Sequence, residues 1–151
     1  GGLKACKQTV NAIYDWDNYS TYYHKDLLGA NNNIIISSPV ISGPKVYELI
    51  NLLKEKQMSG VQITIVTWAP DSYRFGDAAY WMQLHEDMRQ AGFYIKTVEE
   101  SCERFAVIDQ EVVWYGNINL LAKDKVDDSI MRILSKEIAS ELMEITIGDN
   151  G

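Results

Sequence analysis

The sequence predicts an α/β domain in which helices cover both faces of a mixed β-sheet. Short apolar runs rich in β-branched residues alternate along the chain with segments of helical apolar spacing. A strand–helix–strand pattern over residues 33–67 predicts a parallel strand pair joined by a right-handed crossover. Two adjoining strand patterns, at 102–109 and 111–116, predict a hairpin, so the sheet should combine parallel and antiparallel pairs.

Proline and glycine divide the first half of the chain into short elements. We expect residues 1–18 to form an irregular N-terminal segment and residues 19–151 to form a single domain. The elements expected next are, in order, a helix over 19–30, a buried strand at 33–37, a helix from Pro44 to Gly60 and a strand at 61–67. Proline favours the start of a helix because its fixed φ suits the first turn.

The second half continues the alternation with a helix over 77–91, a strand at 93–97, the hairpin strands, a strand at 129–134 and a closing helix over 136–145. Helical spacing places one set of side chains on one side of the helix over 77–91, namely Ala78, Trp81, Met82, His85 and Met88. In the closing helix it directs Ile138, Leu142 and Ile145 towards the core. Glu86 and Asp87 follow His85, but sequence neighbours do not share a helix face. We therefore expect His85 at the surface or at the edge of the core.

Composition narrows the class of protein. Hydrophobic residues make up 46% and charged residues 23%, as in ordinary globular domains. The net charge of -7 argues against a broad basic surface that would hold nucleic acid. No apolar run approaches the roughly 20 residues of a membrane helix, so we expect no membrane association. Cys6 and Cys102 are far apart and the two histidines are scattered, so we expect free thiols in a cytoplasmic protein, with no metal and no cofactor.

Residues 102–119 carry polar side chains at defined intervals. The segment reads Cys-x-Arg-x4-Asp-x6-Gly-Asn-x-Asn and resembles the phospholipase D superfamily motif, His-x-Lys-x4-Asp-x6-Gly-Ser-x-Asn. The spacing agrees throughout, and the matching residues are Asp109, Gly116 and Asn119. Cys102, Arg104 and Asn117 stand where the family has His, Lys and Ser. The resemblance implies a phospholipase D-like domain.

Strand geometry predicts how these residues meet. Alternate residues of a strand share a face, so Cys102 and Arg104 should point the same way. The turn after Gly116 should bring Asn119 towards them. We expect one surface cleft formed by these three side chains, with Asp109 behind it as a structural anchor and Asn117 near its rim.

Active members of the family, as the resemblance implies, use one histidine as nucleophile and a second, from another motif copy, as acid. Without these histidines we expect no catalytic residue, and we expect Arg104, Asn117 and Asn119 to bind phosphate. One alternative is an active phosphodiesterase or nuclease in which a Cys102 thiolate attacks. Another is a purely structural oligomerisation domain, in which Arg104 forms an internal ion pair with Glu103, Asp109 or Asp128.

Four features lie outside the motif: the strand IIISSP at 34–39, a helix that starts with Gly-Pro, the strand GVQITIVT at 60–67 and the final strand SIMRI at 129–133. Together they resemble phospholipase D-like domains attached to bacterial superfamily I helicases and related ATPases. This resemblance implies a dimerising, nucleic-acid-contacting or phosphate-contacting module of a larger helicase- or ATPase-type protein. The sequence holds one motif copy, so we expect a homodimer formed through the aromatic loop from Trp68 to Tyr80 and through Trp114. His24, Lys25 and Asp26 are contiguous within a helical pattern, and we expect them to form a solvent-exposed helix face.

Overall fold

The computed structural model describes residues 11–72 and 77–147. Seven strands form one sheet in the order β1-β7-β6-β5-β2-β3-β4. The strands are β1 (Ala12–Asp15), β2 (Asn33–Ser37), β3 (Gln62–Trp68), β4 (Tyr94–Val98), β5 (Phe105–Ile108), β6 (Val112–Gly116) and β7 (Ser129–Leu134). The helices are α1 (Tyr19–Leu28), α2 (Gly43–Met58), α3 (Ala78–Gln90) and α4 (Lys136–Thr146), with a 3-10 turn, η2 (Pro70–Ser72).

The sheet is mixed, as the sequence predicts. β2 pairs with β3 and β3 with β4 in parallel, and the remaining pairs are antiparallel. The hairpin of β5 and β6 turns at Asp109 and Gln110, whose φ angles of 55° and 59° are both positive. Positive φ at both central residues is the geometry of the tight turn that matches the twist of a two-stranded ribbon.

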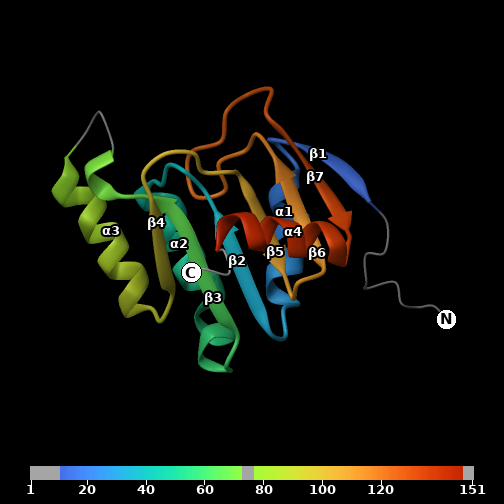
Figure 1. Cartoon of the computed structure of the whole chain (residues 1–151), viewed down its shortest axis with the longest axis horizontal. Helices are drawn as coiled ribbons and strands as arrows, with labels where there is room; N and C mark the ends of the chain where they lie inside the picture. The colour runs from blue at the N-terminus through green and yellow to red at the C-terminus, as the bar shows by residue number, and fades with distance from the viewer. Residues whose placement is uncertain (1–10, 73–76, 148–151) are drawn as a thin grey trace.

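Helices cover both faces of the sheet, so the predicted α/β class is confirmed (Figure 1). The helices α1, α2 and α3 pack on one face and enclose the larger apolar core, which includes Leu27, Leu53 and Leu84. The helix α4 lies on the other face over a smaller apolar cluster, where Leu142 packs with Phe105. In the described part of the chain, no helix has the length and apolar character needed to cross a membrane.

The buried side chains of two helices differ from the predicted sets. In α4, Ala139 and Leu142 are buried while Ile138 and Ile145 are exposed. In α3, Leu84, His85 and Met88 are buried while Met82 is exposed. An amphipathic pattern with several apolar residues admits more than one rotation about the helix axis, and the position of the sheet selects one.

His85 is more deeply placed than the sequence indicated. Its side chain is 1% exposed, and neither ring nitrogen has a hydrogen-bond partner among the described residues. Burial and the nearby Arg89 charge lower the pKa of the imidazole. The neutral form of His85 is therefore the one that the folded chain accommodates.

The segment before α1 also differs from the expectation. Residues 12–15, expected to be irregular, form β1, which pairs antiparallel with β7 at the end of the sheet. Tyr14 in this strand stacks on Tyr22 of α1 and on Trp114 of β6, with ring centroids 4.8 and 5.2 Å apart. These aromatic contacts come from distant segments, and local sequence pattern does not reveal them. Residues 1–10, including Cys6, lie outside the described residues.

The strand registers bring several loops together along the edge of the sheet that is formed by the C-terminal ends of β2 and β3. Ser37 at the end of β2 pairs with Phe105 at the start of β5, and Phe105 pairs with Tyr115 near the end of β6. Gly116 pairs with Ile130 near the start of β7. Loops 99–104 and 117–128 therefore meet beside the start of α2. The hairpin turn at Asp109 lies at the opposite edge.

Candidate functional site

Three side chains hold the loop that precedes β5. The Ser37 hydroxyl donates to the Glu103 carbonyl at 2.6 Å, and the Trp68 indole donates to the Glu100 carbonyl at 2.9 Å. The Tyr115 hydroxyl donates to the Glu103 carboxylate at 3.1 Å. β5 begins only at Phe105, so residues 101–104 do not follow the strand alternation that the sequence predicted.

The structure brings Arg104 and Asn119 together. The Arg104 Nε donates to the Asn119 Oδ1 at 2.9 Å. Arg104 is exposed, whereas Asn119 is almost entirely buried. Among the described residues, no carboxylate forms an ion pair with Arg104. The guanidinium is thus oriented by a neutral amide, and its Nη donors remain available to an anion.

Cys102 has different neighbours. Its Sγ lies 3.5 Å from the Ser37 Oγ, and the half-buried side chain packs against the apolar cluster beneath α4. Burial raises the pKa of this thiol, although the Ser37 hydrogen bond and the Arg104 charge partly oppose the effect. The thiol form therefore dominates near neutral pH. The predicted alternation of Cys102 and Arg104 on one face is not what the structure shows.

The glycine and the first asparagine of the motif fix the loop after β6. A Cβ placed on Gly116 would lie 2.4 Å from the Ser129 carbonyl oxygen, so the two strands can approach only because residue 116 has no side chain. The Asn117 Oδ1 accepts from the Ser129 amide at 2.9 Å. Asn117 is therefore engaged with β7, and its amide oxygen does not face Arg104.

Asp109 lies at the far end of β5, away from Arg104. Its carboxylate accepts hydrogen bonds from the backbone amides of Asn31, Asn32 and Asn33, at distances from 2.7 to 3.2 Å. A carboxylate that accepts several amide hydrogen bonds joins the start of β2 to the hairpin turn. The structure thus places Asp109 in a contact with the backbone, at a distance from the other motif residues.

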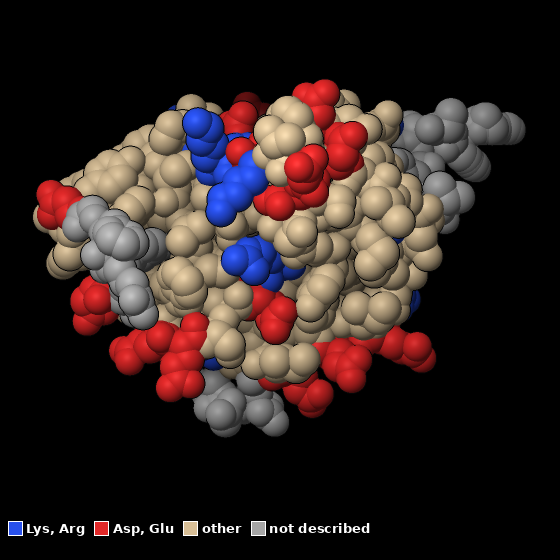
Figure 2. All heavy atoms as spheres, turned by 90° about the horizontal axis from the view of Figure 1, so that it is seen from above, with Lys and Arg blue, Asp and Glu red and all other residues tan. Residues whose placement is uncertain are grey.

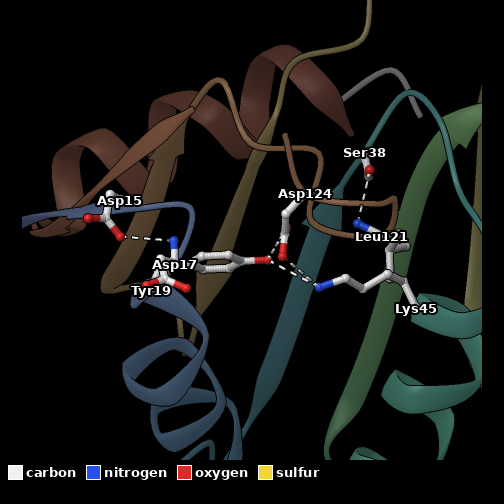
Figure 3. A network of polar contacts seen from close by, with 7 residues as sticks. All are labelled: Asp15, Asp17, Tyr19, Ser38, Lys45, Leu121 and Asp124. Atoms are coloured by element: carbon white, nitrogen blue, oxygen red, sulfur yellow. Dashed lines mark hydrogen bonds and ion pairs between the residues drawn. The ribbon is translucent and has the colours of Figure 1, made fainter. Parts of the chain in front are cut away.

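A second polar network lies at the edge near Arg104, and sequence reasoning missed it (Figure 3). The Asp124 carboxylate accepts from the Tyr19 hydroxyl at 2.9 Å and pairs with the Lys45 ammonium at 3.3 Å. The Ser38 hydroxyl accepts from the Leu121 amide at 3.2 Å and so holds the same loop nearby. The three residues of the network come from α1, α2 and loop 117–128, so no local spacing in the sequence signals it.

A buried ion pair was also missed. Arg132, which is 3% exposed, contacts the Asp26 carboxylate through Nε at 2.6 Å, and the Trp114 indole donates to the same carboxylate at 2.8 Å. The expectation that Asp26 lies on a solvent-exposed helix face is therefore wrong. One signal existed, because Arg132 is two residues after the buried Ile130 in β7 and so shares its face.

Charge at this edge is mixed. Figure 2 shows Lys and Arg side chains gathered near the middle of the face, with Asp and Glu side chains beside and below them. The cations placed here by the described elements are Lys45, Arg104, Lys123 and Lys125. The carboxylates in the loops at the same edge are Asp17, Asp71, Asp77, Glu99, Glu100, Glu103, Asp124, Asp127 and Asp128. A small positive centre therefore lies within an acidic surround.

One family model matches most of the chain. The model of the cardiolipin synthase, PLD-like domain family matches residues 23–147, and the chain belongs to this family of phospholipase D-like domains. No curated protein matches the chain in sequence.

Solved structures share the fold at low identity. Nuc from Salmonella typhimurium, a phospholipase D family member, superposes with a TM-score of 0.69 at 14% identity, covering 90% of this chain and 89% of Nuc. NucT from Helicobacter pylori gives 0.67 at 9% identity, covering 90% and 92%. TrmBL2, an archaeal chromatin protein, gives 0.62 at 12% identity, covering 94% of this chain and 53% of its own.

Proposed function

We propose that the domain binds a phosphate group at Arg104 and Asn119 and does not cleave phosphodiesters. The observation that carries this proposal is the exposed Arg104 guanidinium, which is oriented by the Asn119 amide oxygen at 2.9 Å and has no carboxylate partner among the described residues. A guanidinium with free donors favours a bidentate contact with phosphate oxygens. Asn117, expected to contribute to this site, is engaged with Ser129, so we leave it out of the proposal.

The loss of catalysis is proposed on chemical grounds. The family's histidine position holds Cys102, whose thiol pKa is raised by burial, so the fraction of nucleophilic thiolate at neutral pH is small. A thiol with a raised pKa is also a poorer general acid and base near neutral pH than the histidine that the family uses in both steps of the transfer. The alternative of a Cys102 nucleophile would require an environment that lowers the thiol pKa.

A titration with inorganic phosphate tests the binding. Arg104→Gln should abolish the chemical-shift changes that phosphate produces in the wild-type protein, at millimolar ligand concentrations. Arg89→Gln is the matched control, because Arg89 is an exposed arginine at the C-terminal end of α3 and loses the same charge. Equal binding by both variants and the wild type would refute the phosphate site and favour the purely structural alternative.

A hydrolysis assay tests the absence of catalysis. We expect no turnover of a chromogenic phosphodiester or of single- and double-stranded DNA by the wild-type protein. Turnover that disappears in Cys102→Ala would overturn this part of the proposal and support the thiolate nucleophile.

We also propose that the domain forms a homodimer and belongs to a larger helicase- or ATPase-type protein. A single motif copy in this sequence supports the pairing, because the family implies a site built from two copies. Trp114 is fully buried and cannot supply the expected contact, whereas Tyr80 and Met82 are exposed near the start of α3. Residues 73–76 of the expected aromatic loop lie outside the described residues.

Sedimentation at tens of micromolar protein tests the dimer. We expect a dimer that Met82→Glu converts to monomer, because a charge in an apolar contact is costly. Met58→Glu is the control, since Met58 is an exposed methionine at the C-terminal end of α2. A wild-type monomer under these conditions would contradict the proposal.

TrmBL2 shares the fold and is described as a DNA-binding protein, which keeps nucleic acid among the possible sources of the phosphate. The net charge of -7 and the acidic surround of Arg104 oppose the extended phosphate contacts that a duplex requires. We therefore propose phosphate recognition as the function, with duplex DNA as a weak ligand.

A further inference from the structure

In the network around Asp124, a carboxylate of the chain contacts a cation and a buried hydroxyl. The Lys45 ammonium and the Tyr19 hydroxyl both contact the Asp124 carboxylate, at 3.3 and 2.9 Å. Tyr19 is 1% exposed, and the Lys45 ammonium also donates to its hydroxyl oxygen at 3.5 Å. The Lys45 and Asp124 side chains are 21% and 25% exposed, so water reaches the pair and the carboxylate can leave it.

The network is connected to the Arg104 site through one loop. The pairing of Ser37 with Phe105 places Ser38 beside Arg104 at the sheet edge. The Ser38 hydroxyl accepts from the Leu121 amide, and Leu121 lies between Asn119 and Asp124 in loop 117–128. Asn119, which orients Arg104, and Asp124, which pairs with Lys45, thus belong to one loop. Figure 3 shows this loop held at Leu121 by Ser38, the residue that follows β2.

We propose that Asp124 is an internal competitor for the ligand of this site, and that a phosphate monoester displaces it and takes Lys45 as a second cationic contact beside Arg104. This inference rests on the phosphate site proposed above. In the free protein the Asp124 carboxylate neutralises Lys45. In the bound protein a ligand oxygen replaces it.

Charge matching selects the monoester. A phosphate monoester carries nearly two negative charges at neutral pH, whereas a phosphodiester carries one. Two cations, Lys45 and Arg104, match a dianion, and a monoanion would compete poorly with a carboxylate that is already in place. Each further phosphate of a polymer would lie near the acidic surround, which includes Asp17, Glu99 and Asp127, so a single terminal phosphate fits better than a duplex backbone.

The buried Tyr19 hydroxyl needs an acceptor, so Asp124 can leave only if another acceptor replaces it. Burial and the adjacent Asp124 raise the pKa of Tyr19, so this hydroxyl remains a neutral donor. If Asp124 left without replacement, the Lys45 ammonium would remain 3.5 Å from the hydroxyl oxygen, but the hydroxyl would lose the acceptor for its proton, at a residue that is 1% exposed. A ligand oxygen that accepts from Tyr19 removes this penalty, which links the departure of Asp124 to the arrival of the ligand.

The test compares phenyl phosphate with diphenyl phosphate in titrations followed by NMR on the folded wild-type protein and its variants. Asp124→Asn should raise the affinity for phenyl phosphate about three- to tenfold, since it removes one screened charge contact. Lys45→Met should lower it by a similar factor. Asp127→Asn is the matched control: it lies in the same loop, loses the same charge, and has a φ of 79° that asparagine tolerates.

The outcomes separate the two proposals. Wild-type protein should prefer phenyl phosphate, and Tyr19→Phe should reduce this preference while thermal denaturation confirms folding. If Arg104→Gln abolishes binding but Asp124→Asn and Asp127→Asn have equal effects, the internal competitor is refuted and the phosphate site stands. If Arg104→Gln changes nothing, the phosphate site itself is refuted. A 5′-phosphorylated oligonucleotide that binds no better than its unphosphorylated form would exclude a nucleic-acid terminus as the source of the monoester.

Discussion

The two ends of the β5–β6 hairpin use the residues of one motif in opposite ways. At the turn, the Asp109 carboxylate accepts hydrogen bonds from three consecutive amides and joins the hairpin to the start of β2. At the open end, the exposed Arg104 is held by a single hydrogen bond to Asn119. The turn is built for stability, and the open end leaves donors unused. The motif therefore contains both residues that stabilise the fold and residues with donors available to a ligand.

Gly116 shows that a residue's position along the hairpin does not decide whether it is structural or available to a ligand. It lies at the open end, yet a Cβ there would approach the β7 backbone at 2.4 Å. The structural residues are those that contact backbone atoms of neighbouring strands. The residues available to a ligand are those with unused donors on an exposed side chain. Four measurements test this distinction, and the largest effect is expected at the turn.

Asp109→Ala should destabilise the fold by about 3–4 kcal/mol, because three amide hydrogen bonds to a charged acceptor disappear and alanine is strained at positive φ. Asp109→Asn keeps one acceptor oxygen and tolerates the φ of 55°, so a loss of about half that size is expected. Chemical denaturation measures both free energies of unfolding. A loss below about 1 kcal/mol in Asp109→Ala would show that the turn is not the anchor.

Gly116→Ala should cost about 2–3 kcal/mol, because the added methyl meets the backbone of Ser129 and Ile130, which cannot move without separating β6 from β7. Gly60→Ala serves as a contrast, since Gly60 has open space around it and a positive φ of 106°. Its cost arises from backbone strain alone. Amide hydrogen exchange should rise in β7 for Gly116→Ala and stay unchanged there for Gly60→Ala.

Cys102 provides a smaller effect at the open end. Burial raises the pKa of its thiol, so in a Cys6→Ser background its alkylation near pH 7 should be several-fold slower than that of a free cysteine. The sign follows from ionisation: the rate should keep rising at pH values where an ordinary thiol has already reached its plateau. Thiol titration with a chromogenic disulfide checks this. A rate equal to that of free cysteine would support the thiolate alternative.

Arg104→Gln should change the free energy of unfolding least, by less than about 0.5 kcal/mol, because the side chain is exposed and glutamine can still donate to Asn119. The same variant should lose phosphate binding. Thermal and chemical denaturation measure the first property. A loss above about 1 kcal/mol would place Arg104 among the structural residues and erase the contrast between the two ends of the hairpin.

Sequence reasoning found what is local and missed what is distant. The strand at 33–37 and the crossover to β3 follow from short apolar runs bounded by Pro39 and Gly60. The expected approach of Asn119 to Arg104 is seen in the hydrogen bond between them. The partners of Asp26 and Asp124 lie 106 and 79 residues away in the chain, at Arg132 and Lys45. No pattern of neighbours can indicate which distant cation a carboxylate will meet. For the same reason the strand alternation failed at Cys102, where loop contacts to Ser37 and Trp68 replace strand geometry.

The position of β2 between β5 and β3 affects how the chain folds. Its partner β3 follows after a single helix, but its other partner, β5, is about 70 residues further along the chain. Local pairs form early and distant ones late, because closing a long loop costs more entropy. Until the hairpin docks, β2 presents an unpaired edge of three isoleucines, Ile34, Ile35 and Ile36, which is a template for pairing with another chain. The Asp109 carboxylate, by capturing the amides at the start of this strand, closes that edge, so slow docking of the hairpin would appear as aggregation before it appears as lost binding.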